Sequence, residues 1–276
     1  MNYQHAYHAG NFADLFKHAL LLALLDEVRR SPRPFTAIDT HAGAGVYDLE
    51  GEAARKTGEG EAALRLMSAR DAPGSLQPLR KAVGRLNRSR PVRFYPGSPW
   101  LIGEALRSGD TAVGCELNAA AAAELRRALA PFGRLEVAVG DGWTLAPRCA
   151  PAAPVPLFVL IDPPFEADDD GERAAHALDR LLSRNGSAVV AVWAPIKDLA
   201  SFDALAADLE DAARGRPVMV AELRMRALDD PTRLNGCAMV VANPPEGLAD
   251  VAREAGGWIL SNLGEAGGAI EVRQLS

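Results

Sequence analysis

Residues 155–166, VPLFVLIDPPFE, form an apolar run that stops at an aspartate, two prolines and an aromatic ring. A strand formed by this run ends here, because prolines lack a backbone N–H. Asp162 supplies a carboxylate and Pro163 a carbonyl of fixed direction, so together they can accept both hydrogens of an exocyclic amine. Phe165 can stack on the base that carries this amine. The motif predicts catalytic positions for Asp162, Pro163 and Phe165, and substrate contacts for Pro164 and Phe165.

The chemistry that suits this motif is methyl transfer to an aromatic amine. Such an amine is a poor nucleophile, since its lone pair is delocalised into the ring. Holding both of its N–H groups localises the lone pair and aims it at an electrophilic methyl group. The enzyme then contributes mainly positioning and desolvation. Whether Asp162 also takes the proton depends on its pKa, which a sequence does not give.

Three further strand ends carry groups that suit a nucleoside ligand. Gly43 begins a Gly-Ala-Gly turn, in which the backbone can approach a ligand closely. Glu116 can accept hydrogen bonds from two ribose hydroxyls, and Asp141, followed by Gly142, suits an adenine amino group. In a parallel α/β sheet these ends meet at one edge. Together they predict an S-adenosylmethionine pocket lined by Gly43, Glu116, Asp141 and Gly142.

Each of these groups also has a purely structural interpretation. A glycine turn is common in ordinary loops, and Asp141 is a good helix N-cap. Residues 243–246, Asn-Pro-Pro-Glu, repeat the Asx-Pro-Pro pattern without the aromatic ring. They follow the last apolar run and precede a helical segment, so we interpret this second motif as structural, with its prolines in the first turn of that helix.

A sheet is required to position these motifs. Apolar, β-branched runs alternate with segments of helical period, which is typical of a parallel sheet with helices on both faces. A short loop separates the last two runs, so we expect them to pair as a hairpin. The sequence predicts an α/β fold of the class I methyltransferase, Rossmann-like type: a seven-stranded, mostly parallel sheet with an antiparallel last strand. The runs are residues 35–39, 110–117, 134–141, 155–162, 187–195, 218–225 and 237–243.

Residues 46–93 interrupt the alternation. They hold no strand-like run, and we interpret them as a small, basic, helical insertion in a methyltransferase domain made of residues 1–45 and 94–276. The chain has a net charge of −6, but residues 65–93 carry a local charge of +7. A basic block on an acidic body is expected where a polyanion docks, although a solvated helical face gives the same pattern. The block holds Arg65, Arg70, Arg80, Lys81, Arg85, Arg88, Arg90 and Arg93 against Asp71.

The composition restricts the class of protein. With 276 residues, 48% of them hydrophobic, the chain suits one large domain. We expect no membrane span, because no stretch approaches the roughly 18–20 apolar residues required, and no signal peptide. Three scattered cysteines favour a reducing cytoplasm over a disulfide framework. Four of the five histidines lie within the first 41 residues, but no acid or cysteine accompanies them at ligand spacing, so no metal is expected.

Several sequence blocks span most of the chain in a fixed order: YQHAYHAGNFADLFKH, DTHAGAGVYDL, FYPGSPWLI, the strand-end Glu116, GDGW and LIDPPFE. In these blocks the chain resembles the bacterial ribosomal RNA large subunit methyltransferase J family. The resemblance implies a class I enzyme that uses S-adenosylmethionine to methylate N6 of one adenine in 23S ribosomal RNA, naked or partly assembled. It also implies a helical insertion after the first strand and places Asp162 on the catalytic acid. We expect a cytoplasmic monomer.

The resemblance also implies roles that the motifs alone do not assign. Tyr3 falls on a position near the substrate. Ser98 also precedes Pro99 at the start of a helix, so capping is an alternative role for it. Phe165 stands where tyrosine is common in the family, a change that leaves stacking intact. The implied cofactor contacts outside the motifs above are Lys17, His18, His41 and Ser98.

Three alternatives stay open. The Asp162 motif cannot separate adenine from cytosine or RNA from DNA, so a DNA adenine-N6 or cytosine-N4 methyltransferase is the nearest alternative. The lack of a large DNA-reading domain favours a substrate defined by RNA shape. A nicotinamide-dependent oxidoreductase is disfavoured, because Asp48 stands where the third glycine of its fingerprint belongs. A non-catalytic RNA-binding module is disfavoured by the intact Asp162.

Overall fold

The computed structural model describes residues 8–52, 60–88 and 91–275, and its centre is a large twisted sheet. Within these ranges the sheet has eight strands in the order β10-β8-β9-β7-β6-β1-β4-β5. The strands are β1 (Thr36–Asp39), β4 (Thr111–Glu116), β5 (Leu135–Val139), β6 (Leu157–Ile161), β7 (Val189–Ile196), β8 (Val218–Arg224), β9 (Gly236–Ala242) and β10 (Ala269–Leu275).

The strand order reverses beside β1. The chain runs from β1 to β4 and β5 on one side, then returns to β6 and β7 on the other, and these five strands are parallel. β9 is antiparallel to both β7 and β8. The predicted α/β fold, with a mostly parallel sheet and a closing hairpin, is therefore confirmed. Ligands of this fold class bind beyond the carboxyl ends of the strands where the order reverses, here at β1 and β6.

The sheet has one strand more than the seven predicted. β10 pairs antiparallel with β8 at the edge of the sheet, and none of its residues is fully buried. Its sequence, AIEVRQL, mixes charged with apolar residues, because an edge strand needs no continuous apolar run. A search for fully buried runs therefore misses it.

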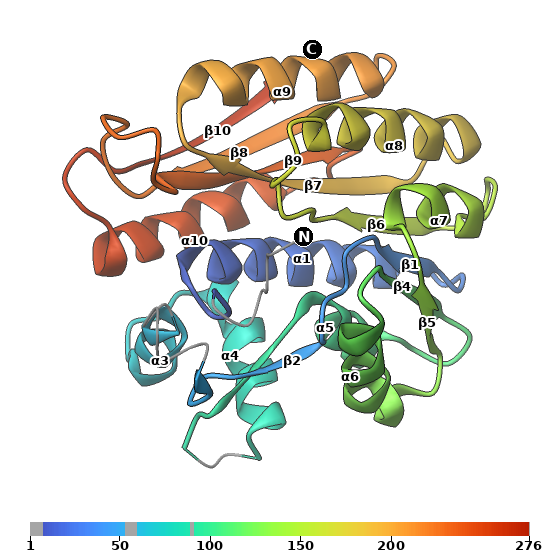
Figure 1. Ribbon diagram of the computed structural model, residues 1–276, viewed down its shortest axis with the longest axis horizontal. Helices are drawn as coiled ribbons and strands as arrows, with labels where there is room; N and C mark the ends of the chain where they lie inside the picture. Colours follow the sequence, from blue (N-terminus) through green and yellow to red (C-terminus); the bar gives the residue numbers. More distant parts are fainter. Residues whose placement is uncertain (1–7, 53–59, 89–90, 276) are drawn as a thin grey trace.

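Helices cover both faces of the sheet (Figure 1). Side chains of β6 alternate between two apolar clusters: Phe158 and Leu160 face one layer of helices, and Val159 and Ile161 face the other. This burial on both faces explains the unbroken apolar run of β6. No helix among the described residues is long and apolar enough to cross a membrane. One layer contains α1 (Phe12–Arg30), α5 (Ser98–Ala105), α6 (Ala119–Leu129) and α10 (Leu248–Leu263), and the other α7 (Gly142–Cys149), α8 (Asp170–Arg184) and α9 (Leu199–Ala212).

Helix α1 carries three polar side chains into the interior: Asp14, Lys17 and His18. The Asn11 side chain accepts the N–H of Asp14 and caps the helix. The helix is surrounded by the sheet, by α10 and by α5, so five of its six leucines are buried, and Lys17 and His18 are only 4% and 1% exposed. Buried polar groups need partners, which makes α1 a structural source of site residues.

The segment 46–93 lies below α1 in Figure 1 and contains a short strand. β2 (Val46–Asp48) pairs antiparallel with β3 (Phe94–Pro96), so the prediction that this segment holds no strand is wrong. Three residues are too few to show a period in a sequence. Leu66, Leu79 and Val83 bury in the same apolar cluster as α1. The division into domain and insertion remains a prediction. The helices here are α3 (Glu61–Ser68), η2 (Gly74–Leu76) and α4 (Gln77–Leu86).

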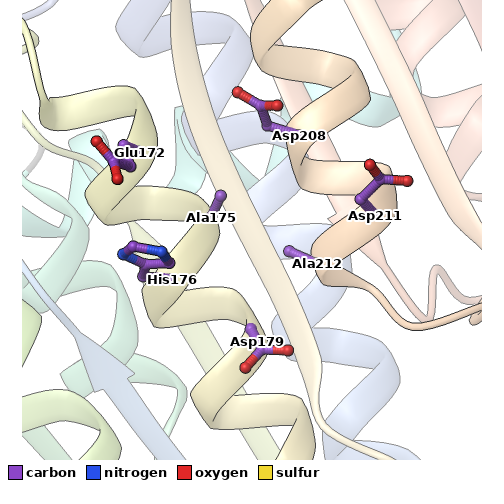
Figure 2. A pocket seen from close by; sticks show the side chains of 7 residues that line it. All are labelled: Glu172, Ala175, His176, Asp179, Asp208, Asp211 and Ala212. Carbon is purple, nitrogen blue, oxygen red and sulfur yellow. The ribbon is translucent and has the colours of Figure 1, made fainter.

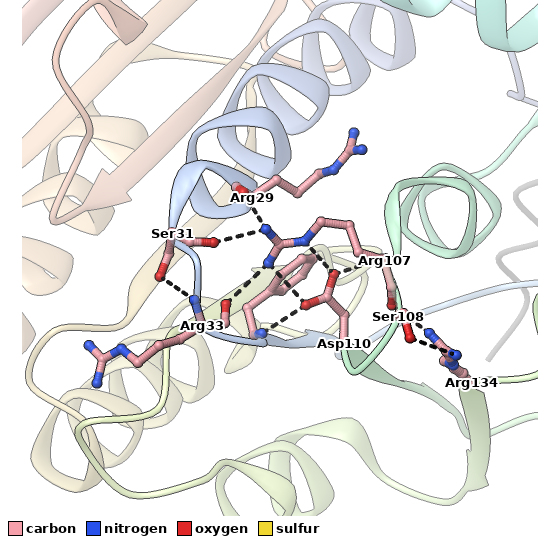
Figure 3. Close-up of polar contacts among 8 residues, drawn as sticks. Arg29, Ser31, Arg33, Arg107, Ser108, Asp110 and Arg134 are labelled. Atoms are coloured by element: carbon pink, nitrogen blue, oxygen red, sulfur yellow. Dashed lines mark hydrogen bonds and ion pairs between the residues drawn. The ribbon is translucent and has the colours of Figure 1, made fainter.

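A polar clamp fixes the far end of α1 (Figure 3). The Arg107 guanidinium pairs with Asp110, which is almost fully buried and accepts the N–H of Phe35 just before β1. Arg107 thereby sets where α1 ends and where β1 and β4 begin. Its guanidinium also donates to three backbone carbonyls in and just after the last turn of α1: those of Arg29, Ser31 and Arg33.

Candidate active site

Asp162 lies directly after β6, beside β1, with a lysine held against it. Lys17 Nζ is 2.7 Å from Asp162 Oδ2 and 2.9 Å from Asp14 Oδ1. Burial lowers the pKa of Lys17, but the two carboxylates outweigh this and hold it well above its usual value. The ammonium group therefore stays charged and fixes the direction of the Asp162 carboxylate. Oδ1 of Asp162 has no hydrogen bond among the described residues and can accept an N–H.

The rest of the Asp162 motif forms a wall beside this carboxylate. Pro163 is buried, Pro164 is half-buried, and Phe165 is half-buried with a left-handed φ of 50°. Such a backbone costs about 1–3 kcal/mol for a non-glycine residue and is often found at functional sites. The Phe165 ring lies 6.1 Å from the Trp193 ring, and Lys17 Nζ lies 5.8 Å from the same indole. Trp193 thus lies beside both Phe165 and the lysine that is bonded to Asp162.

Asp39, at the end of β1, is a buried carboxyl group with an unsatisfied oxygen. It is 1% exposed, and Oδ2 has no hydrogen-bond partner among the described residues. Burial raises the pKa of Asp39 to about 7, although the Ser98 hydroxyl opposes this shift; the Asp162 carboxylate adds to it. A carboxyl group in this state would gain from a ligand that brings a positive charge or an N–H donor.

Ser98 and His18 are both buried in the interior. Ser98 is the first residue of α5, and the N-cap is Gly97, with no side-chain cap hydrogen bond. The capping alternative for Ser98 is therefore wrong, and its hydroxyl interacts with Asp39. His18 Nδ1 lies 2.9 Å from the Tyr95 hydroxyl. His18 is thus tied to β3, and the structure does not bring it into contact with Asp162.

The glycine turn and Glu116 hold each other in place. Gly43 has a φ of +61°, and a Cβ built on it would lie 2.2 Å from the Tyr47 hydroxyl oxygen, so only glycine fits there. The Gly43 N–H donates to Glu116 Oε2 at 2.9 Å, and the Asn118 N–H donates to Oε1 at 2.7 Å. The carboxylate of Glu116 is therefore oriented, while each oxygen keeps a lone pair for a ligand hydroxyl.

Asp141 is a helix cap in the structure, as the structural interpretation allowed. Its carboxylate accepts the N–H of Trp143 and the hydroxyl of Thr144 at the start of α7. A Cβ built on Gly142 would lie 1.9 Å from the carbonyl oxygen of Thr40. The missing side chain of Gly142 thus lets α7 pack directly against the end of β1, which brings Asp141 to the same edge as Asp39.

His41 is a neutral, half-buried side chain near Asp141 and Asp162. Its Nδ1 lies 2.7 Å from the Thr40 hydroxyl, and its ring meets the Trp143 indole edge-on at 4.7 Å. Burial lowers the pKa of His41 to about 4, against the opposing effect of the Asp162 carboxylate and other acids. At neutral pH the imidazole is therefore uncharged and can only donate or accept one hydrogen bond on each nitrogen.

The remaining predictions fall elsewhere. Tyr3 lies outside the described residues. Asn243 follows β9, which runs against the parallel strands, so it lies at the opposite edge of the sheet. Its side-chain amide donates to the carbonyls of Gly186 and Ala188, a structural contact. The expected first turn there is wrong, because α10 begins at Leu248, after Gly247.

Sequence reasoning assigned no role to Asp39, Trp193 or Arg173. An aspartate that ends a strand looks like an ordinary cap until its burial and missing partner are known. Trp193 lies inside an apolar strand, and only the neighbouring Phe165 reveals its position. Arg173 could have been noticed, because a cation in the first turn of a helix opposes the helix dipole.

Away from this edge, α8 and α9 enclose an acidic groove of about 300 Å³ (Figure 2). It contains His176 and carboxylates such as Asp179 and Asp208, and none of the residues predicted from the motifs. Among the described residues no group of three or more His, Cys, Asp and Glu side chains is arranged to hold a metal ion.

Comparison with known proteins gives consistent matches along the chain. The family model described as "Ribosomal RNA large subunit methyltransferase D, RlmJ" matches residues 32–275. Ribosomal RNA large subunit methyltransferase J from Escherichia coli (strain K12) is 31% identical over 97% of this chain and 95% of its own length. The protein of the same name from Haemophilus influenzae is 31% identical over 92% of this chain and 91% of its own length.

A solved structure shares the whole fold. Protein LPL1258 from Legionella pneumophila superposes with a TM-score of 0.87, covering 98% of this chain and 99% of that one at 22% identity. At this identity the likeness is one of fold. It extends over the entire length, including the segment between β1 and α5.

Proposed function

The chain belongs to the ribosomal RNA large subunit methyltransferase J family, and we propose that it transfers a methyl group from S-adenosylmethionine to N6 of an adenine in 23S ribosomal RNA. The observation that carries this proposal is the Asp162 carboxylate, placed at the strand reversal and oriented by Lys17 at 2.7 Å. The protein acts in the cytoplasm as a monomer, on naked or partly assembled RNA.

In the proposed reaction, Asp162 and the Pro163 carbonyl hold the amine of a flipped adenine. Asp162 Oδ1 accepts one N–H, because Oδ2 is already bonded to Lys17. The carbonyl accepts the other N–H, and Phe165 stacks on the base. The amine is thereby aligned and its lone pair directed away from the ring. Asp162 is also positioned to receive the proton that the methylated nitrogen releases.

The chemistry of the strand ends fits S-adenosylmethionine. The cofactor supplies an electrophilic methyl group on a positively charged sulfur. Glu116 holds the ribose hydroxyls, and Asp141 accepts from the adenine amine. The unsatisfied oxygen of Asp39 suits the cationic methionine end. His41, Gly43, Ser98 and Gly142 complete this side of the pocket, with Lys17 and His18 behind it. Tyr3 is assigned to the substrate side by resemblance alone.

The proposed function is tested by incubating the protein with labelled S-adenosylmethionine and naked 23S RNA, assembled large subunits or genomic DNA. Nucleoside analysis should find the label as N6-methyladenosine from RNA. Label in DNA, or on cytosine N4, would instead favour the nearest alternative.

Asp162→Ala tests the mechanism in the same assay. The variant should lower methyl transfer by at least about 100- to 1000-fold, as expected when one preorganised hydrogen-bonding group is removed. Its affinity for S-adenosylhomocysteine should stay within a few fold. Asp168→Ala, an exposed change on the same loop, is the matched control and should keep full activity. Near-normal turnover in Asp162→Ala would rule out the mechanism.

A further inference from the structure

Arg173 reaches from the first turn of α8 to the start of α7. Its Nη2 lies 3.4 Å from Asp141 Oδ2, and its guanidinium carbon lies 5.4 Å from the centre of the Trp143 ring. A cation in the first turn of a helix is disfavoured by the helix dipole, so α8 gains nothing from this residue locally. The contacts that favour an arginine at this position are with Asp141 and Trp143, at the start of α7.

These contacts continue from α8 to the end of β1. The Arg173 guanidinium lies over the Trp143 ring, and the centre of that ring is 4.7 Å from the centre of the His41 ring in an edge-to-face arrangement. Asp141 is held by the Trp143 N–H at 3.3 Å and by the Thr144 hydroxyl at 3.0 Å. Arg173 adds a third contact from a different helix, on the same oxygen as Thr144. The direction of the Asp141 carboxylate therefore depends on where α8 lies.

We propose that Arg173 is a positioning residue for the adenine end of the cofactor: it orients Asp141 toward the adenine amine and supports Trp143 at the side of the ring. This inference rests on the proposed function, which assigns Asp141 to the adenine. Arg173 touches Asp141 and Trp143 and acts through them.

The position of α8 gives Arg173 a second consequence. Asp162 and Phe165 lie in the segment between β6 and α8, and Arg173 is only eight residues after Phe165. By fixing the first turn of α8 to α7, Arg173 restrains one end of the segment that holds the target base.

A simple surface ion pair is the competing explanation. The side chains of Arg173 and Asp141 are 40% and 38% exposed, and pairs of this kind contribute little to stability. Such a pair would not distinguish ligands that carry the adenine amine from ligands that lack it. The test therefore compares S-adenosylhomocysteine with S-inosylhomocysteine, in which an oxygen replaces the amine.

The experiment measures both dissociation constants by titration calorimetry for wild type, Arg173→Gln and Arg173→Lys. Wild type should prefer S-adenosylhomocysteine, since an inosine oxygen faces the Asp141 carboxylate. In Arg173→Gln this preference should fall by about five- to tenfold, within the usual range for coupled neighbours. Arg173→Lys keeps the charge but loses the planar contact with Trp143. In this variant the preference for S-adenosylhomocysteine should fall by less than threefold. Arg180→Gln, an exposed change on the same helix, should leave the preference unchanged.

The outcomes separate the two proposals. If wild type binds neither compound, the proposed function fails. If wild type binds both and Arg173→Gln weakens them equally, or not at all, Arg173 does not act on the amine and the inference is overturned. Arg173→Met, which keeps most of the side-chain length without the charge, answers the same question if Arg173→Gln does not fold. In turnover, the inference expects the KM for the cofactor to rise by a larger factor than kcat falls.

Discussion

Three buried or nearly buried carboxyl groups surround Lys17 at the reversal of strand order. Asp14 and Asp162 contact its ammonium group, and Asp39 interacts with it electrostatically at longer range. A ligand with a positive sulfur and a positive amino group suits a site lined by these carboxyl groups. Asp39 has the raised pKa, chiefly because it is buried, and the Asp162 carboxylate adds to this shift.

Asp39→Asn should remove a pH dependence of stability. The folded pKa of about 7 lies above the unfolded value of 3.8, so the folded state holds an extra proton between these values. The free energy of unfolding therefore falls as pH rises through this window. From pH 5 to 8 wild type should lose about 2–3 kcal/mol relative to Asp39→Asn. Urea unfolding without ligand at pH 5, 6, 7 and 8 measures this difference, and parallel pH profiles would contradict it.

At the scale of elements, the contact between α7 and the end of β1 decides where the proposed cofactor residues of α7 lie. Gly142 permits this contact because its absent Cβ leaves room for the Thr40 carbonyl. The same packing places Asp141 and Trp143 next to His41. Gly142 was predicted from the sequence as a ligand contact. In the structure it is also required for the packing of α7 against the end of β1.

Gly142→Ala should therefore harm both fold and ligand binding. Pushing α7 away from β1 should cost about 1–3 kcal/mol, the usual range for overpacking, and should weaken S-adenosylhomocysteine binding by moving Asp141. Gly257→Ala is the matched control: it lies inside α10 with open space around its Cβ position. That change should stabilise by about 0.5–1 kcal/mol. Thermal unfolding measures both, and equal effects would refute the packing argument.

The segment 46–93 is the other element whose role can be tested. Its basic residues are not equivalent, because Arg85 pairs with Glu104 and Arg93 with Asp48. Arg90 lies outside the described residues. Arg65 and Arg88 are exposed and, within the described part of the chain, make no ion pair. They are therefore candidates for contacts with RNA phosphates, as are the exposed Arg70 and Lys81.

Arg65→Glu combined with Arg88→Glu should weaken binding to a 23S RNA fragment. The slope of log affinity against log salt should become shallower by about one to two, as expected for two lost phosphate contacts. The matched control is Arg148→Glu with Arg180→Glu, two exposed residues on α7 and α8, which gives the same change in net charge. If both pairs weaken binding equally, the effect is one of overall charge and the segment has no special role.

At the scale of the whole molecule, the site depends on a frame that is fixed far from it. The N-terminal half of α1 carries Lys17 into the site. The Arg107–Asp110 clamp holds the C-terminal end of α1 against the starts of β1 and β4 (Figure 3). The Asp110 carboxylate accepts from the N–H groups of Phe35 and Arg107 as well as from the guanidinium. Burial opposes its ionisation, but these bonds prevail and hold the pKa of Asp110 below its usual value.

Asp110→Asn should destabilise the fold by about 2–4 kcal/mol, because it leaves a guanidinium and a backbone N–H poorly paired. The depressed pKa means that this stabilisation is present above pH 4 and is lost as pH falls through the folded pKa. Urea unfolding at pH 7 and pH 3 should therefore show a large difference between the proteins at pH 7 and a smaller one at pH 3. A constant difference would contradict the role of ionisation.

The sequence by itself determined the alternation of strands and helices and the residues at the strand ends. These are local properties. A strand that is buried on both faces of the sheet requires an unbroken apolar run, and prolines or glycines mark where that run ends. β10 and the three-residue β2 were not predicted, because an edge strand and a very short strand leave no such pattern in the sequence. The family could also be recognised from the sequence, since its motifs are contiguous.

Only the tertiary structure decided which of these groups act on one another. Lys17 and Asp162 are 145 residues apart in the chain, and no local pattern indicates that an ammonium group orients the carboxylate. Burial and distances between elements likewise decide three other features. These are the raised pKa of Asp39, the contact of Trp193 with Phe165, and the contact of Arg173 with Asp141. Charge interactions act through space, and a sequence records only neighbours along the chain.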